Sequence, residues 1–216
     1  LTVVSSPSPA KDVVYLKEHF GLEHVFFNDD VFAMNTPRLQ EMGAMLARHG
    51  IHYTISMRID ALNAERIHLL EDTGCKVLLV GVESASPKIL QLIDKRLNHA
   101  RFEQNVTLCQ QSDLVVSFNF ICGYYGETEE TLRETFDFLL RHRILYTSFF
   151  ATPYPGTKLY EMIRDQIGDE AEFIERLSDA DLQTDYVLNM SALPEKRLRR
   201  IRDRMVVGSA VHCFTT

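Results

Sequence analysis

Short apolar runs alternate with longer amphipathic stretches along most of the chain. The runs are rich in β-branched and aromatic residues, as strands are, whereas the amphipathic stretches carry apolar residues at helical spacing. Such alternation is typical of βα units around a parallel sheet. The third run is almost wholly apolar, which predicts a strand buried on both faces. The five predicted strands are residues 25–28, 53–57, 77–82, 115–122 and 146–151.

Each predicted strand is followed by a helix, and one further helix precedes the first strand. Ser8-Pro9 and Thr36-Pro37 each join a capping side chain to a proline in the first turn, which is typical of helix starts. Glycines are predicted to end the first three helices, at Gly21, Gly50 and Gly74. The later helices are predicted at the segment after Ser86-Pro87, at 99–112, at 128–142 and after Pro155-Gly156.

A helix ahead of the first strand indicates that a leading strand is missing, so the first βα unit is incomplete. The predicted fold is α/β, a partial TIM-type (β/α) barrel with parallel strands and a C-terminal helical extension. The βα rhythm fades near residue 166, where polar and acidic residues become frequent. We therefore expect residues 1–165 to form the barrel and residues 166–216 to form the extension.

The composition narrows the class of protein. With 216 residues, of which 45% are hydrophobic and 25% charged, the chain is long enough for one globular domain with a substantial core. Its net charge of −7 argues against a surface built to bind nucleic acid. No run approaches the roughly 20 apolar residues that cross a bilayer. We expect no membrane partner and a cytoplasmic location; a nucleic-acid partner is not indicated, although the charge leaves room for a local basic patch.

The four cysteines lie far apart in the sequence, so no metal site made from this chain alone is predicted. Three of them, Cys75, Cys109 and Cys122, lie in apolar surroundings and are expected to be core residues. A final helix, predicted from Pro194 to about Val207, carries six basic residues. Such a run is most often a solvated helix face, and the alternative is an interface with another domain, a partner or an anionic substrate.

Polar residues follow every predicted strand. Right-handed crossovers bring the carboxyl ends of parallel strands to one edge of a sheet, where such folds carry their sites. Each residue also has a local explanation, such as a pair between Arg58 and Asp60 or a helix start at Glu127. Five polar strand ends at one edge nevertheless predict a binding site. Its candidate residues are Asn28, Asp29, Asp30, Arg58, Glu83, Ser84, Asn119, Gly123, Thr152, Pro153 and Tyr154.

The same segments resemble motifs of the radical S-adenosylmethionine (radical SAM) superfamily, in the branch often found with a cobalamin-binding domain or a methylthiotransferase-type architecture. Residues 25–32 resemble its strand ending in an acidic pair, 80–86 its glycine-hydrophobic-glutamate-serine segment, and 120–128 its glycine-leucine-proline-glycine-glutamate-threonine turn. The resemblance covers roughly residues 8–165. In chain order the segments read VFFNDDVF, RID, VGVESAS, FICGYYGET and TPYPGT.

The resemblance implies a binding site for S-adenosylmethionine at these strand ends. Asn28-Asp29-Asp30 would lie near the methionine amine, Glu83 and Ser84 near the ribose or the amino-acid part, and the strand that carries Asn119 and ends at Gly123 beside the adenine. Arg58 would contact a carboxylate or the substrate. Acidic, amide and hydroxyl side chains can accept hydrogen bonds from the amine and the ribose diol of S-adenosylmethionine, and an arginine can donate to its carboxylate. A glycine allows the adenine ring to approach the backbone closely. No catalytic residue and no metal ligand within the chain is assigned.

The sequence also departs from the family pattern. The cysteine triplet that holds the family's [4Fe–4S] cluster is absent, together with the first strand, and Tyr124-Tyr125 replaces leucine-proline. Because Leu1 is not a natural start, we expect the cluster ligands upstream of Leu1 and an upstream domain of the same protein. The resemblance further implies cobalamin in a separate domain. Natural loss of the triplet is the alternative.

Three functions are compatible with these residues. The first is the core of a radical SAM enzyme that cleaves S-adenosylmethionine reductively for methylation, sulfur insertion or related group transfer. The second is a non-catalytic ligand-binding or interaction module derived from that fold. The third is a β/α-barrel lyase or hydrolase that holds a divalent cation at Asp29, Asp30 and Glu83. The identity of the substrate is not encoded in any of these motifs.

Overall fold

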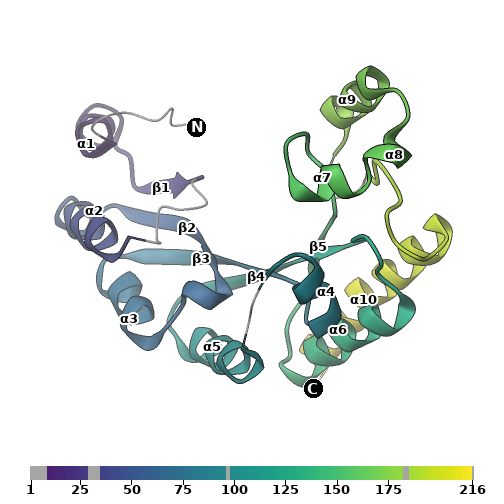
Figure 1. Cartoon of the computed structure of the whole chain (residues 1–216). Helices are drawn as coiled ribbons and strands as arrows, with labels where there is room; N and C mark the ends of the chain where they lie inside the picture. The colour runs from purple at the N-terminus through teal and green to yellow at the C-terminus, as the bar shows by residue number, and fades with distance from the viewer. Residues whose placement is uncertain (1–8, 29–34, 96–97, 182–184, 216) are drawn as a thin grey trace. The chain divides into compact units, whose positions relative to one another are not determined.

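A computed structural model describes residues 9–28, 35–95, 98–181 and 185–215 of the chain (Figure 1). Its described part divides into two compact units, which are considered separately below. The first unit comprises Leu1–Gly81 and Leu97–Ser117, and the second comprises Val82–Arg96 and Phe118–Thr216.

The strands form one five-stranded sheet in the order β1-β2-β3-β4-β5, which is the order of the chain. Strand β1 pairs in parallel with β2, β2 with β3, and β4 with β5. Strands in chain order with helices between them are the topology of a partial TIM-type (β/α) barrel, so the predicted fold class is confirmed. The strands are β1 (His24–Phe27), β2 (His52–Arg58), β3 (Cys75–Glu83), β4 (Val115–Cys122) and β5 (Thr147–Phe150).

The helices follow the predicted pattern, with one ahead of β1 and at least one after every strand. No helix in the described ranges is long and apolar enough to cross a membrane. The α-helices of the first unit are α1 (Pro9–Phe20), α2 (Thr36–Arg48), α3 (Ala64–Asp72) and α5 (His99–Gln111). Those of the second are α4 (Pro87–Leu92), α6 (Glu129–Arg141), α7 (Lys158–Met162), α8 (Arg164–Ile167), α9 (Glu170–Asp179) and α10 (Glu195–Thr215).

The core of the first unit lies between its helices and strands β1 to β3. Leu39 and Leu46 of α2 and Tyr53 and Ile55 of β2 are completely buried. The Tyr53 hydroxyl lies 2.7 Å from the hydroxyl of Thr73, so the one polar atom of that buried ring is satisfied. Leu39 and Leu46 therefore lie on the inward face of α2.

The start of α2 differs from the prediction. Asn35, not Thr36, is the N-cap, and its side chain accepts a hydrogen bond from the backbone N–H of Arg38. Proline lies at the second helical position instead of the first. Asparagine and threonine both suit an N-cap, so the spacing to the proline alone could not separate the two starts. The cap predicted at Ser8 lies outside the described residues.

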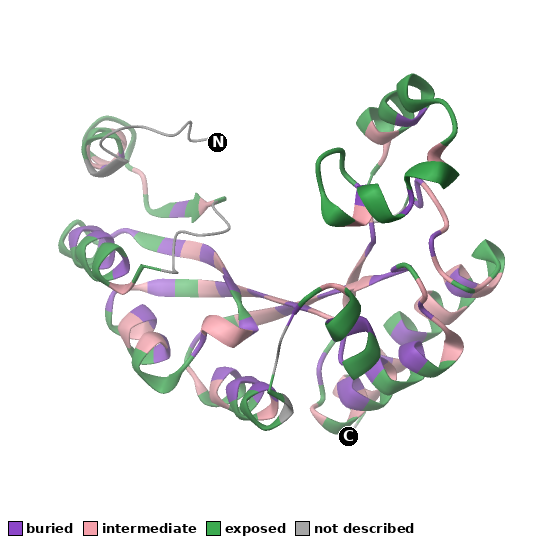
Figure 2. Ribbon diagram, viewed as in Figure 1, coloured by how far each residue is buried: buried purple, intermediate pink, exposed green. Residues whose placement is uncertain are grey.

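Strand β3 is not buried on both faces as predicted. Leu78, Val80 and Val82 are completely buried, whereas the alternating residues Val77 and Leu79 are only half-buried (Figure 2). One face of the strand is tightly packed and the other is not, because successive side chains of a strand point to opposite faces. A continuous apolar run does not distinguish the two cases.

The second unit is closed by the C-terminal helix. Helix α10 packs against α6 and strand β5, with Leu198, Met205 and Ser209 buried. It extends to Thr215, beyond the end predicted near Val207. The last predicted barrel helix is interrupted at Ile163 and continues as α8. Whether the boundary predicted at residue 165 separates two domains stays a prediction.

Candidate functional site

The first unit contributes two of the predicted strand-end residues. Asn28 follows β1 and is exposed, and Arg58 ends β2 beside Gly81 of β3. The Arg58 guanidinium donates two hydrogen bonds to the Asp60 carboxylate, at 2.9 and 2.7 Å. The pair with Asp60 that the sequence suggested as an alternative to a binding role for Arg58 is therefore confirmed. Asp29 and Asp30, and with them two of three ligands of the cation alternative, lie outside the described residues.

The second unit places Glu83 at the end of β3 in an ion pair. Lys95 Nζ lies 2.7 Å from Glu83 Oε1, and the Lys95 side chain is only 4% exposed. The Glu83 side chain is 23% exposed. Glu83 also adopts φ = +69°, a left-handed conformation that a residue with a Cβ atom rarely takes. An unfavourable backbone conformation next to a nearly buried charge pair is typical of functional sites.

Helix α4 brings Lys95 back to the strand end. The helix begins after Ser86 and ends within two turns, where Asp94 has φ = +54°. The backbone N–H of Lys95 then donates to the carbonyl of Leu90 at 2.8 Å. This hydrogen bond across a left-handed residue reverses the chain at the helix end. The turn directs the Lys95 side chain toward Glu83, twelve residues earlier in the sequence.

Ser84 and Ser86 anchor the same segment to α6. Ser84 is 1% exposed, and its hydroxyl lies 3.2 Å from that of Thr135. The Thr135 hydroxyl also accepts a hydrogen bond from the backbone N–H of Ala85, and the Ser86 hydroxyl donates to Glu134. The hydroxyls of Ser84 and Ser86 thus fix the segment in place. The contact between Ser84 and a ligand stays a prediction.

The turn after β4 is closed by a buried carboxyl group. Glu127 is 1% exposed, and its Oε2 accepts a hydrogen bond from the backbone N–H of Gly123 at 2.5 Å. Burial raises the pKa of Glu127 to about 7, although the backbone N–H groups of Gly123 and Tyr124 favour its charged form. Thr128 is the N-cap of α6. Glu127 is therefore part of the turn and not of the helix.

A tyrosine of the C-terminal segment covers Gly123. Gly123 has φ = +86°, and a Cβ atom at this position would lie 2.8 Å from the ring of Tyr186. The Tyr186 ring in turn packs against Phe150 of β5, with 4.7 Å between the ring centroids and 36° between the ring planes. The guanidinium of Arg199 lies 5.3 Å from the centre of the Phe150 ring and 5.9 Å from that of Tyr186. Glycine at residue 123 thus allows an aromatic ring to approach the backbone, and here that ring is Tyr186.

The remaining predicted residues lie around the ends of β4 and β5. Asn119 is half-buried in β4 and faces Thr147 in the strand pairing. The hydroxyl of Thr152 donates to the carbonyl of Phe150 at 3.2 Å. Pro153 is buried, whereas Tyr154 is exposed. Asn28 and Arg58 belong to the first unit, and the other described candidates belong to the second.

The cysteines do not form a cluster site. Cys75, Cys109 and Cys122 are buried, and burial raises the pKa of each thiol to about 12. A cluster needs thiolates that lie close together. Within the described ranges no three histidine, cysteine or acidic side chains are grouped so as to hold a metal ion. The expectation that these three cysteines are core residues is confirmed, and the described residues do not fit a [4Fe–4S] cluster.

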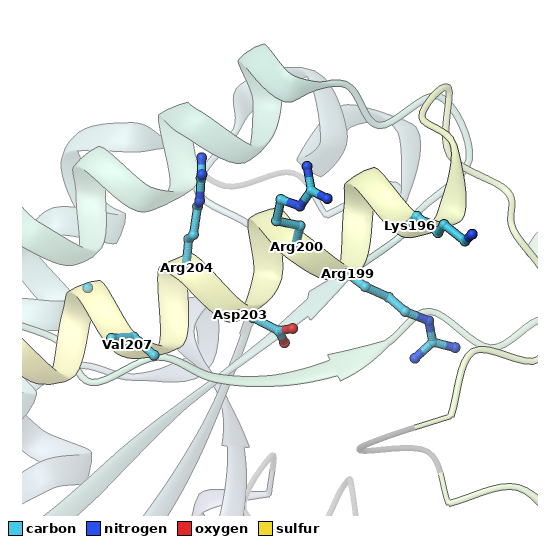
Figure 3. A pocket seen from close by; sticks show the side chains of 7 residues that line it. Lys196, Arg199, Arg200, Asp203, Arg204 and Val207 are labelled. Atoms are coloured by element: carbon cyan, nitrogen blue, oxygen red, sulfur yellow. The ribbon is translucent and has the colours of Figure 1, made fainter.

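Two hollows of the second unit lie outside the predicted set. One, of about 240 Å³, is lined by aliphatic side chains together with Tyr124, Tyr125 and Lys158. The other, of about 730 Å³, is an open groove along the basic side of α10 (Figure 3). Arg200 and Arg204 point to one side of the helix in this view, and Arg199 and Asp203 point to the other. The basic run is thus partly solvated, as expected.

Part of the basic run is structural instead. Arg197 of α10 donates to both oxygens of Glu129 in α6, and the Arg202 guanidinium lies 4.9 Å from the centre of the Phe150 ring. The sequence analysis did not identify Lys95, Tyr186 or these arginines as neighbours of the site. No sequence motif contains these residues, because each contacts a segment that is distant in the sequence.

The model of the radical SAM superfamily matches residues 4–139 of the chain. Among curated proteins, the chain is 31% identical over 154 residues to an uncharacterised methyltransferase of Pyrococcus horikoshii, which covers 70% of the chain and 34% of the relative. It is 26% identical over 156 residues to bacteriochlorophyllide d C-12(1)-methyltransferase of Chlorobaculum tepidum, with the same two shares. It is 29% identical over 164 residues to a tRNA-2-methylthio-N(6)-dimethylallyladenosine synthase of Rickettsia rickettsii, which covers 73% of the chain and 36% of the relative. The chain thus spans about a third of the length of these relatives.

Solved structures support the same fold. The radical SAM methyltransferase TsrM of Kitasatospora setae, with cobalamin and a [4Fe–4S] cluster bound, superposes with a TM-score of 0.62 at 18% identity. That match covers 73% of this chain and 33% of TsrM. Strand order and the family match over 136 of 216 residues agree with one another. The chain belongs to the radical SAM superfamily.

Proposed function

We propose that this chain is the core of a radical SAM enzyme that transfers a methyl group or a sulfur-containing group in the whole protein. The observation that carries the proposal is the end of β3, where the superfamily match includes a strained glutamate with an accessible carboxylate edge. Relatives named as methyltransferases and as a methylthio-group synthase support this class of reaction. The non-catalytic alternative receives no support from these relatives, all of which are named as enzymes.

The residues of the second unit fit an adenosine group. Glu83 supplies a carboxylate that can accept hydrogen bonds from the two ribose hydroxyls. The Tyr186 ring occupies the space next to the Gly123 backbone, and Tyr186 and Phe150 provide aromatic faces on which a planar base can pack. In this superfamily, reductive cleavage of S-adenosylmethionine supplies a 5′-deoxyadenosyl radical. The chain's own contribution is to bind and orient the nucleoside.

We assign the cluster to another part of the protein. Cys75, Cys109 and Cys122 are buried core thiols, and no step of the reaction is assigned to them. We propose that three cysteines upstream of Leu1 hold the [4Fe–4S] cluster, and that an upstream domain of the same protein holds cobalamin. TsrM and OxsB, two solved enzymes of this fold, are described with cobalamin bound. We also propose a cytoplasmic location, which suits an oxygen-sensitive cluster.

The decisive experiment uses the full-length protein. It is reconstituted anaerobically with iron and sulfide, reduced, and assayed for 5′-deoxyadenosine released from S-adenosylmethionine. We expect release above a cluster-free control, and loss of release in a Glu83→Ala variant that still binds its cluster by optical spectroscopy. A folded full-length protein that binds a cluster but releases no 5′-deoxyadenosine would contradict the proposal.

A further inference from the structure

The Glu83–Lys95 ion pair has one free acceptor atom. Lys95 Nζ contacts Oε1 of Glu83, at 2.7 Å. The other oxygen, Oε2, has no hydrogen-bond partner within the part of the chain that the structure describes. The Glu83 side chain is partly exposed, whereas the Lys95 side chain is almost completely buried. The buried Lys95 therefore holds the carboxylate through Oε1, and Oε2 can accept a hydrogen bond from a ligand.

A buried ammonium group is costly unless it has a partner, so Lys95 confines Glu83 to the orientation in which the pair forms. The backbone around Glu83 is also fixed, because Ser84 and Ala85 are hydrogen-bonded to Thr135 of α6. Helix α4 fixes the other end, through the hydrogen bond from Lys95 N–H to Leu90. The position of the Glu83 carboxylate is thus determined from both sides before any ligand binds.

We propose that Lys95 is a positioning residue for the nucleoside: through its ion pair it holds the Glu83 carboxylate ready to accept the ribose hydroxyls. The inference rests on the proposed function, because it takes Glu83 to contact the ligand. In this proposal Lys95 acts through the carboxylate and does not itself contact the ligand. Its effect is therefore expected on recognition of the ribose diol, and not on recognition of the base.

The test compares two nucleosides that differ in a single hydroxyl group. Affinities of the cluster-reconstituted full-length protein for 5′-deoxyadenosine and 2′,5′-dideoxyadenosine are measured anaerobically by calorimetry. The variants are Lys95→Met, which removes the charge, and Lys95→Arg, which keeps it. Lys88→Met is the matched control, because Lys88 is an exposed lysine on the same helix.

We expect Lys95→Met to weaken binding of 5′-deoxyadenosine about tenfold, which is the effect of one charge-assisted hydrogen bond. Binding of 2′,5′-dideoxyadenosine should change less than about twofold, since a factor of two is under 0.5 kcal/mol. Lys95→Arg should recover most of the loss, and Lys88→Met should have no effect. An equal loss for both nucleosides, or no loss for either, would overturn the inference. Failure of the unmodified protein to bind either nucleoside would instead contradict the proposed function.

A double-mutant cycle covers the case in which Lys95→Met does not fold. Glu83→Gln removes the charge that the lysine requires, so Glu83→Gln/Lys95→Met leaves no unpaired carboxylate. If Lys95 acts through Glu83, the double variant binds 5′-deoxyadenosine as Glu83→Gln does. A further loss in the double variant would show that Lys95 acts independently of Glu83. Circular dichroism and the melting temperature verify the fold of each variant.

Discussion

Gly123 combines two constraints at one residue. Its positive φ disfavours any residue with a Cβ atom, and the Tyr186 ring occupies the space where that atom would lie. Gly156 has a nearly equal φ of +83°, with nothing within 4 Å of a Cβ atom. Comparing alanine variants at the two glycines therefore distinguishes the cost of the backbone conformation from the cost of displacing Tyr186.

We expect Gly123→Ala to lower the free energy of unfolding by more than Gly156→Ala does. A left-handed non-glycine residue costs about 1 kcal/mol, and both variants should show this loss. The displaced Tyr186 ring should add about 1–3 kcal/mol in Gly123→Ala alone. Urea unfolding of both variants measures the difference. Equal losses would mean that Tyr186 does not pack on this turn.

Glu127 makes the stability of the turn depend on pH. Its pKa in the folded state is raised to about 7 by burial, above the ordinary value of 4.5. Between these two values the unfolded chain loses the proton and the folded chain keeps it, so stability falls as pH rises through this window. Above pH 7 both states are ionised and this contribution no longer changes.

Glu127→Gln should remove this part of the pH dependence. The unmodified chain is expected to lose up to about 3 kcal/mol between pH 4.5 and 7 through this group, relative to the variant. Glutamine keeps an oxygen that can accept from Gly123 N–H, so the turn itself should persist. Unfolding in urea at several pH values compares the two proteins. Parallel curves would show that the pKa of Glu127 is the same in the folded and the unfolded chain.

At this scale the sequence predicted which strand ends carry polar groups, but not the partners of those groups. Glu83 and Gly123 could be identified because a parallel sheet places strand ends at one edge. Lys95 and Tyr186 could not, because a single lysine after a short helix and a tyrosine in a polar stretch carry no periodic signal. Local sequence patterns do not encode contacts between segments far apart in the chain.

At the scale of elements, α6 and α10 approach closely at Gly208. A Cβ atom on Gly208 would lie 2.7 Å from Cζ of Phe136 in α6. Arg197 and Glu129 link the same two helices near the start of each. The absence of a side chain at Gly208 thus sets the distance between the helices.

We expect Gly208→Ala to destabilise the protein, although alanine favours helix over glycine by about 1 kcal/mol. The Phe136 ring would have to move out of its contact with α10. Phe136→Leu should make the same alanine tolerable by removing the end of the ring. Thermal unfolding of both single variants and the double variant tests this. A stabilised Gly208→Ala variant would show that helix propensity outweighs the contact.

The elements were predicted more reliably than their ends. All five strands and the seven helices of the predicted barrel occur where apolar periodicity placed them, apart from the interruption of the last helix at Ile163. The errors are at boundaries, such as the end of α10, where Val211 and Phe214 are exposed and give no amphipathic signal. A helix can continue through such residues because its backbone hydrogen bonds do not depend on burial.

At the scale of the molecule, the C-terminal segment is joined to the strand ends of the second unit. Met190 accepts a hydrogen bond from Gly126 N–H, and Ala192 donates one to Glu127. The Ser209 hydroxyl accepts another from Tyr146 N–H just before β5. These bonds connect residues on both sides of the boundary predicted at residue 165.

We therefore expect a chain that ends at residue 165 to lose protection in the second unit. Hydrogen exchange should become faster in β5, which loses its contact with α10, and in β4, which pairs with β5. Strands β1 and β2 serve as the internal control and should keep their exchange rates. Unchanged exchange in β4 and β5 would establish residues 166–216 as an independent extension.

The buried cysteines give the protein intrinsic reporters of local opening. Thiols with a pKa near 12 are almost entirely protonated at pH 8 and should resist alkylation until the surrounding structure opens. Cys75 and Cys109 lie in the first unit and Cys122 lies in the second. Mass spectrometry of chains pulsed with iodoacetamide should therefore show which unit opens first as urea is raised. Simultaneous labelling of all three would mean that the two units unfold as one.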